Sequence, residues 1–170
     1  SIFLMKNIPK IIVTPGEPAG IGYDILLDLP RRSFEANIIS IASIDILEER
    51  ADLLKKKINF VKVDINNNLI PKVAENDILV HDLKNVCQVQ IGKPNIKHVP
   101  LIIESLDLAI EACLNKVASA LVTGPVQKSI IMKYGKKFSG HTEYIASKTG
   151  GEPIMMLHTN DLKIALLTTH

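Results

Sequence analysis

Hydrophobic residues recur along this chain with two alternating spacings, one typical of strands and the other typical of helices. Short continuous apolar runs predict strands, and they lie at 11–14, 38–42, 60–63, 77–80 and 118–122. Apolar residues spaced about three or four apart predict helices, and these lie at 20–29, 44–54, 100–115 and 126–132. Because strands alternate with helices, we predict an α/β protein with a mostly parallel sheet.

The end of the chain follows a different pattern. A helix is predicted over 142–148, with Gly150 as its stop. Two apolar runs, 154–157 and 162–167, flank a polar tetrad that favours a turn, so we predict a late antiparallel hairpin. His170 follows the second run directly, and we expect it at the carboxyl end of its strand, where ligands and metals collect in α/β proteins.

Composition narrows the class of protein further. Aromatic residues make up 4% of the chain and Trp is absent, so the core must be built of Ile, Leu and Val, which suits buried parallel strands. A net charge of +2 with scattered lysines does not indicate nucleic-acid binding. Two distant cysteines suggest a reduced, cytoplasmic protein. No apolar stretch approaches transmembrane length, and Met5 is interpreted as a native start behind a short leader scar.

The first segment with candidate chemistry is the loop TPGEPAGIG at 14–22, between the first strand and the first helix. Glycines let the backbone approach a ligand, and free N–H groups at a helix start attract anions. Its spacing is neither the dinucleotide fingerprint nor a P-loop. We expect Gly16, Glu17, Gly20 and Gly22 to lie near a ligand cleft, although a tight strand-to-helix connection would give the same pattern.

Two further segments have a similar place, before a helix. In Thr123-Gly-Pro-Val-Gln-Lys128, the lysine is expected one turn into the helix, within reach of a phosphate or carboxylate; an exposed helix lysine is the alternative. In FSGHTE at 138–143, Thr142 or Ser139 can cap the helix, and His141 can donate a hydrogen bond to a ligand. A capped helix with an incidental histidine is the alternative there.

The last segment is Thr168-Thr169-His170. A neutral imidazole at the tip of a strand is a suitable ligand for a borderline metal ion, and a terminal disordered histidine is the alternative. The remaining histidines have no ligand-like spacing with His170 and are interpreted as structural or surface residues: His81, His98 and His158.

Taken in this order, the four segments resemble the 4-hydroxythreonine-4-phosphate dehydrogenase family of vitamin B6 biosynthesis. The matching stretches are TPGEPAGIG at 14–22, ALVTGPVQK at 120–128, FSGHTE at 138–143, MML at 155–157 and ALLTTH at 165–170. The resemblance implies a fold like that of isocitrate and isopropylmalate dehydrogenases, here incomplete because the family's second half is absent. It implies a first α/β domain over 1–120 and the start of a second, dimer-forming domain over 121–170.

The resemblance also implies an activity, the NAD-dependent oxidation of 4-phosphooxy-L-threonine. The resulting 2-amino-3-oxo acid loses carbon dioxide to give 3-amino-2-oxopropyl phosphate. His141 and Thr142 would bind the substrate, with Lys128 as a lesser candidate in the cleft. His170 would be the first of three histidines on a divalent metal (zinc, magnesium or cobalt), which would polarise the hydroxyl. The catalytic base is not identified, and the family's homodimer shares its active sites.

The chain departs from the family at Tyr23, where a proline is usual, and at His98, where a Gly-containing stretch is usual. The first departure is expected to alter only the start of the helix. Two alternatives to the dehydrogenase remain: a phosphate-ligand transferase, since such loops also suit acyl-phosphate chemistry, and a truncated remnant that folds or dimerises without turnover. For the 170 residues alone we expect an incomplete site.

Overall fold

The computed structural model describes residues 8–67, 70–84 and 87–166. The chain divides into two compact units, Ser1–Lys137 and Phe138–His170. The second unit begins later than the predicted seam near residue 120, because the strand at that seam pairs within the first sheet. The division into domains at 120/121 stays a prediction for the complete protein.

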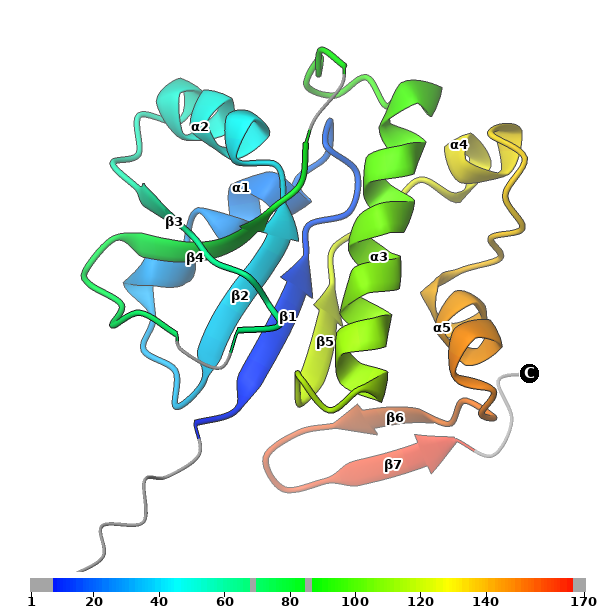
Figure 1. Cartoon of the computed structure of the whole chain (residues 1–170). Helices are drawn as coiled ribbons and strands as arrows, with labels where there is room; N and C mark the ends of the chain where they lie inside the picture. The colour runs from blue at the N-terminus through cyan, green and yellow to red at the C-terminus, as the bar shows by residue number, and fades with distance from the viewer. Residues whose placement is uncertain (1–7, 68–69, 85–86, 167–170) are drawn as a thin grey trace, which may run out of the picture. The chain divides into compact units, whose positions relative to one another are not determined.

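A five-stranded sheet forms the first unit, and all its strand pairs are parallel (Figure 1). The strands lie in the order β3-β4-β2-β1-β5. Their bounds are β1 Lys10–Thr14, β2 Asn37–Ala42, β3 Asn59–Lys62, β4 Asp77–Asp82 and β5 Ala120–Thr123. The central strands are aliphatic and buried on both faces, as the composition predicted: Ile12, Ile39, Ile41 and Val80 have no exposed surface.

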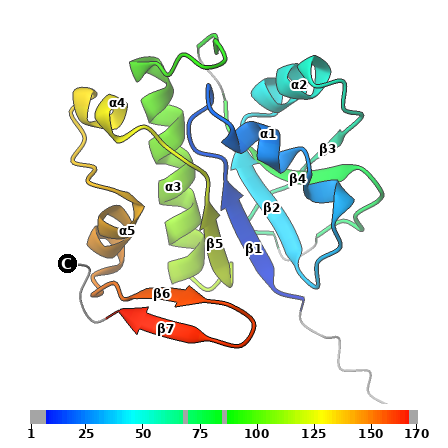
Figure 2. The same cartoon turned by 180° about the vertical axis from the view of Figure 1, so that it is seen from behind.

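Helices cover both faces of this sheet (Figures 1 and 2). α1 (Gly22–Leu26) and α2 (Ile44–Leu53) lie on one face, and α3 (Val99–Leu114) lies on the other. α3 buries Leu106, Ala109 and Ile110 along one stripe, with Cys113 partly buried beside them. This arrangement confirms the predicted α/β class with a mostly parallel sheet.

The first helix is shorter than predicted. α1 ends at Leu26, and the 3₁₀ helix η1 (Leu29–Arg31) follows it. Pro30 lies in the first turn of η1, where its missing N–H is not needed. The proline therefore begins a new turn instead of ending the helix.

Two elements near the end of the first unit are also displaced from prediction. β5 begins at Ala120 rather than at 118, because the amides of Val117 and Ala118 still bond to the carbonyl of Ala112 in α3 (2.8 and 3.0 Å). α4 (Lys128–Lys133) begins two positions later than expected, because Gln127 is extended.

The second unit contains one helix and a hairpin. α5 (His141–Thr149) ends at Gly150, whose left-handed φ of 69° confirms the predicted stop. β6 (Met155–His158) and β7 (Lys163–Leu166) pair antiparallel, which confirms the late hairpin. The turn is closed by the amide of Thr159 on the carbonyl of Leu162 (2.8 Å). Among the described helices, none has the length and hydrophobicity needed to span a bilayer.

Candidate functional site

The order of the strands places a topological switch point between β1 and β5. The chain leaves β1 toward β2 on one side and reaches β5 by crossing over through α3 from β4. In open parallel sheets, ligands bind outside the carboxyl ends of the strands at such a point. The two loops that emerge there are the glycine loop, defined as residues 14–22, and the Thr-Gly-Pro loop, defined as residues 123–127.

These two loops are packed directly against each other. The amide of Gly124 donates to the carbonyl of Thr14 (2.6 Å), and the amide of Glu17 donates to the carbonyl of Pro125 (3.0 Å). A Cβ on Gly22 or Gly124 would overlap the carbonyl oxygen of Pro15, and one on Gly16 would overlap that of Pro125. The glycines are therefore required by the approach of one protein backbone to another, and Gly16 also has a φ of +79°.

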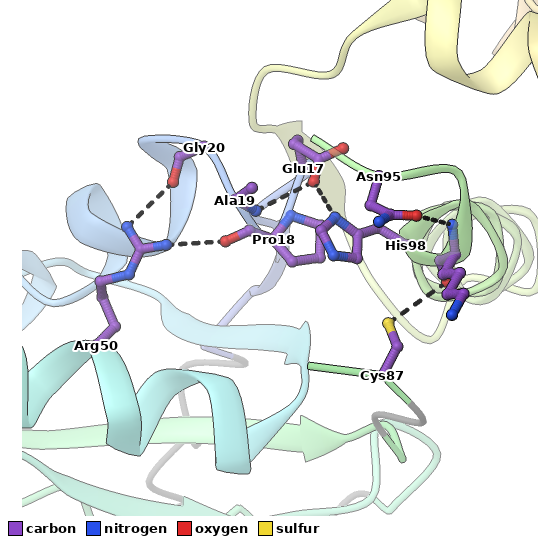
Figure 3. Close-up of polar contacts among 9 residues, drawn as sticks. Glu17, Pro18, Ala19, Gly20, Arg50, Cys87, Asn95 and His98 are labelled. Atoms are coloured by element: carbon purple, nitrogen blue, oxygen red, sulfur yellow. Dashed lines mark hydrogen bonds and ion pairs between the residues drawn. The ribbon is translucent and has the colours of Figure 1, made fainter. Parts of the chain in front are cut away.

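Glu17 points into the protein, and its side chain is only 5% exposed. One carboxylate oxygen, Oε1, accepts a hydrogen bond from the amide of Ala19 (3.1 Å) and lies within hydrogen-bond distance of Nδ1 of His98 (2.5 Å) (Figure 3). His98 is the last residue of the 3₁₀ helix η2 (Ile96–His98) and the N-cap residue of α3. The carboxylate is thus held by a residue at the N-terminus of α3.

Arg50 holds the other side of the glycine loop. Its guanidinium is buried on α2 and donates to the carbonyls of Pro18 (2.8 Å) and Gly20 (3.3 Å) (Figure 3). It also forms an ion pair with Asp24 of α1 at 2.6 Å. The loop is consequently fastened from α2 on one side and from the start of α3 on the other, with a further bond from the amide of Gly92 to the carbonyl of Ala19 (2.8 Å).

Tyr23 belongs to the hydrophobic core of the first unit. It is one of the largest fully buried side chains, so its effect extends well beyond the start of the helix, which was all that the sequence predicted for it. Burial raises the pKa of the Tyr23 phenol, and a hydrogen bond with the backbone of Ser43 offsets only part of that rise. The phenol is therefore neutral at physiological pH.

Lys128 is the first residue of α4 and is exposed, so the prediction that it lies one turn into the helix is wrong. Pro125 cannot donate a backbone hydrogen bond, and the extended Gln127 delays the helix to position 128. Lys128 still follows the Thr-Gly-Pro loop closely in the sequence. Its contact with a ligand stays a prediction.

In the second unit, His141 and Thr142 begin α5, as expected. The N-cap residue is Gly140 and no side chain caps the helix, so the predicted capping by Thr142 or Ser139 is wrong. The His141 imidazole packs edge-on against Phe138 (centroids 5.6 Å apart, planes at 81°), and Phe138 also contacts Tyr144 at 5.3 Å. Thr142 is exposed, and Glu143 lies in the first turn of α5.

The predicted metal ligand, His170, lies outside the described residues. Within residues 8–67, 70–84 and 87–166, no group of three or more His, Cys, Asp or Glu side chains could hold a metal ion. Of the three histidines interpreted from the sequence as structural or surface residues, His98 is buried, His158 is exposed, and His81 Nδ1 accepts from the amide of Ile65 (3.3 Å).

Sequence reasoning found the glycine loop but missed the two side chains that hold it, His98 and Arg50. The only signal for His98 was that it stands where a Gly-containing stretch was expected. Arg50 falls within a predicted helix, where an arginine normally faces solvent. The structure brings together Gly16, Glu17, Gly20 and Gly22 with the Thr-Gly-Pro loop.

Comparisons with known proteins agree on one family. Residues 34–170 match the family described as pyridoxal phosphate biosynthetic protein PdxA. The 4-hydroxythreonine-4-phosphate dehydrogenase of Wigglesworthia glossinidia brevipalpis is 41% identical over 170 residues, which is 98% of this chain and 50% of that protein. The enzyme of the same name from Pseudoalteromonas translucida is 38% identical, over 95% of this chain and 49% of its own length.

A solved structure supports the fold. The crystal structure of a 4-hydroxythreonine-4-phosphate dehydrogenase from Burkholderia phymatum superposes with a TM-score of 0.86 at 22% identity, covering 96% of this chain and 50% of that one. The chain therefore spans about half the length of the curated relatives and of the solved structure that it matches.

Proposed function

The chain belongs to the PdxA family of pyridoxal phosphate biosynthetic proteins, and on that premise we propose that it supplies the glycine-loop half of a 4-hydroxythreonine-4-phosphate dehydrogenase. The proposed reaction is the NAD-dependent oxidation of 4-phosphooxy-L-threonine, followed by decarboxylation to 3-amino-2-oxopropyl phosphate. The observation that carries the proposal is the pair of interlocked loops at the switch point between β1 and β5.

In this proposal the chain's own residues bind and orient the substrate. His141 and Thr142, at the start of α5, are the proposed contacts to the phosphorylated hydroxy-amino acid, and Lys128 is a lesser one. The glycine loop supplies a rigid wall, since Arg50 and His98 restrain it from two sides. NAD, when bound, accepts the hydride from the alcohol carbon.

The proposed divalent metal, whether zinc, magnesium or cobalt, needs about three protein ligands. The described residues do not form such a group, and His170 is the one ligand proposed from this chain. When bound, such a metal would supply Lewis-acid polarisation of the substrate hydroxyl. We further propose a cytoplasmic homodimer with shared active sites, in keeping with the low cysteine content and the apolar hairpin of the second unit.

The test is an assay of the protein expressed from its whole coding sequence. The protein is mixed with 4-phosphooxy-L-threonine, NAD and a divalent metal, and the NADH formed is compared with the carbon dioxide released. Equal amounts of the two products are expected. Turnover of an acyl phosphate without NADH would instead support a phosphate-ligand transferase and overturn the dehydrogenase.

A further inference from the structure

The pairing of Glu17 with His98 goes beyond the residues assigned to the proposed reaction. The two side chains are 5% and 1% exposed, and they come from positions separated by 81 residues. Burying a carboxylate is costly unless it is hydrogen-bonded, and among the described residues the contacts of this one all fall on Oε1. His98, on the α3 side of the sheet, therefore stabilises the buried side chain of Glu17 in the loop that follows β1.

Hydrogen-bond chemistry sets the direction of this contact. A carboxylate oxygen accepts hydrogen bonds, so with Glu17 as a carboxylate the hydrogen between Oε1 and Nδ1 of His98, 2.5 Å apart, is assigned to Nδ1. The same oxygen accepts from the amide of Ala19 (3.1 Å). His98 thereby fixes the carboxylate, and the carboxylate fixes the turn at Pro18-Ala19.

The backbone of Glu17 extends this chain of contacts to the second loop. Its amide donates to the carbonyl of Pro125 (3.0 Å), while its carbonyl accepts from the amide of Gly20 (2.9 Å). A shift of Glu17 would therefore move the Thr-Gly-Pro loop relative to the glycine loop. The close contacts of Gly16 and Gly124 leave no room for the two loops to slide without separating.

We propose that His98 is a positioning residue: acting through Glu17, it sets the relative placement of the two loops at the switch point. The inference rests on the proposed function, because it takes these loops to form one wall of the substrate cleft. His98 acts through Glu17 and need not contact substrate. Misplacing a positioned group by about 1 Å can cost a reaction roughly 100-fold.

The first arm of the test needs no enzymatic activity. Hydrogen exchange is measured at the amides of Glu17 and Ala19 in the 170-residue chain, in the wild type and in His98→Ala. Exchange at both amides should accelerate by at least about 10-fold, the effect of losing roughly 1.4 kcal/mol of local protection, while amides in β2 keep the wild-type rate. Uniform acceleration throughout the unit, or none in the loop, would overturn the proposal.

The matched control is His81→Ala. His81 also bonds to a distant backbone group, the amide of Ile65, but it lies on β4, which β2 separates from β1. Its loss should lower stability and leave loop exchange and kinetics unchanged. The conservative variant His98→Asn, whose amide can donate in place of Nδ1, should restore slow exchange. If His98→Ala does not fold, the result for His98→Asn decides. A folded His98→Asn protein in which the amides of Glu17 and Ala19 exchange faster than in the wild type would overturn the proposal.

A spectroscopic measurement on the wild type is independent of every variant. Nitrogen NMR of the His98 imidazole should show a hydrogen on Nδ1 that exchanges slowly with solvent. An imidazole with its only hydrogen on Nε2 would be incompatible with donation to Glu17.

The second arm uses the protein expressed from its whole coding sequence. Per folded molecule, His98→Ala should reduce kcat/KM for 4-phosphooxy-L-threonine by about 10-fold or more, and His98→Asn should recover most of it. A purely structural residue would lower only the folded fraction. If the wild type lacks dehydrogenase activity, the proposed function fails, and the exchange and NMR measurements still decide the role of His98.

Discussion

At the scale of single residues, the glycine loop is specified by steric demands that come from a distant part of the chain. Gly16 has a left-handed φ of +79°, and a Cβ added there would overlap the carbonyl of Pro125. Gly92 has a similar φ of +74°, but a Cβ added there would meet only open space. Comparing substitutions at the two positions therefore distinguishes the free-energy cost of a left-handed backbone from the cost of a steric clash.

Replacing these glycines by alanine should give different losses of stability. Gly92→Ala should cost about 1 kcal/mol, the penalty for a left-handed residue. Gly16→Ala adds overpacking of roughly 1–3 kcal/mol and should cost about 3 kcal/mol in total. Urea unfolding of both variants measures this difference. Equal losses of stability in the two variants would mean that the glycine loop and the Thr-Gly-Pro loop can move apart to accept the added methyl group at no energetic cost.

Arg50 should tolerate no substitution, including lysine. A guanidinium can donate at once to Pro18, Gly20 and Asp24, and a single ammonium group cannot reproduce that planar arrangement. We expect Arg50→Met to lose about 3 kcal/mol in urea unfolding, and Arg50→Lys to lose most of that amount.

Arg31 provides the matched control for Arg50. Its side chain is 75% exposed and pairs with Asp28 at 3.5 Å, so Arg31→Lys should change stability by less than about 0.5 kcal/mol. An Arg50→Lys variant as stable as Arg31→Lys would refute the importance of the planar donor set.

At the scale of elements, sequence reasoning succeeded where the pattern is local. The strands from β1 to β4, the helices α2 and α3, and the β6–β7 hairpin follow from apolar periodicity and from turn residues such as Gly150. Sequence reasoning failed where a contact between residues far apart in the sequence determines the local structure. The contact between Glu17 and His98 joins the glycine loop to the start of α3, 81 positions away in the sequence, and no periodic pattern predicts it.

Asp82 links three elements of the first unit and should make their stability depend on pH. It lies at the end of β4, accepts from the amide of Ile44 at the start of α2 (3.0 Å), and pairs with Lys62 of β3 (2.7 Å). Burial alone would raise its pKa, but the hydrogen bonds from Lys62 and Ile44 and the charge of Lys62 together lower the pKa of Asp82 below its ordinary value.

The sign of the effect follows from that lowered pKa. The Asp82 carboxylate stabilises the fold at pH values above its unfolded pKa of about 3.9, and this contribution is lost as the pH falls through the folded pKa. The stability gap between wild type and Asp82→Asn should therefore be constant near neutral pH and shrink below about pH 4. Urea titrations at a series of pH values measure it, with Glu48→Gln on the exposed face of α2 as the control. A difference in stability between wild type and Asp82→Asn that persists well below pH 4 would refute the stabilising role of the Asp82 carboxylate.

At the scale of the whole molecule, the hairpin of the second unit leaves apolar side chains in water. Met155, Met156 and Leu157 are consecutive and 43%, 56% and 58% exposed, so apolar groups lie on both faces of β6. Across from Leu157, Ile164 of β7 is 46% exposed. Surfaces of this kind mark association sites.

We therefore predict that the 170-residue chain associates with itself as its concentration rises. Met156→Lys and Ile164→Lys should weaken that association in sedimentation experiments, because a charge must then be desolvated at the contact. Leu53→Lys, at an even more exposed apolar position on α2 (61%), should not weaken it. Equal effects of all three substitutions would point to nonspecific aggregation instead.

These 170 residues by themselves are expected to lack dehydrogenase activity. A catalytic divalent site generally needs about three protein ligands, and His170 is the single ligand proposed from this chain, which spans half the length of its relatives. The chain alone should bind zinc, magnesium or cobalt weakly and should form no NADH from 4-phosphooxy-L-threonine and NAD. The measurement uses protein of confirmed intact mass, with the product of the whole coding sequence assayed beside it. NADH formation by a monodisperse monomer of the 170 residues would show that they contain a complete site, and the half-site argument would be wrong.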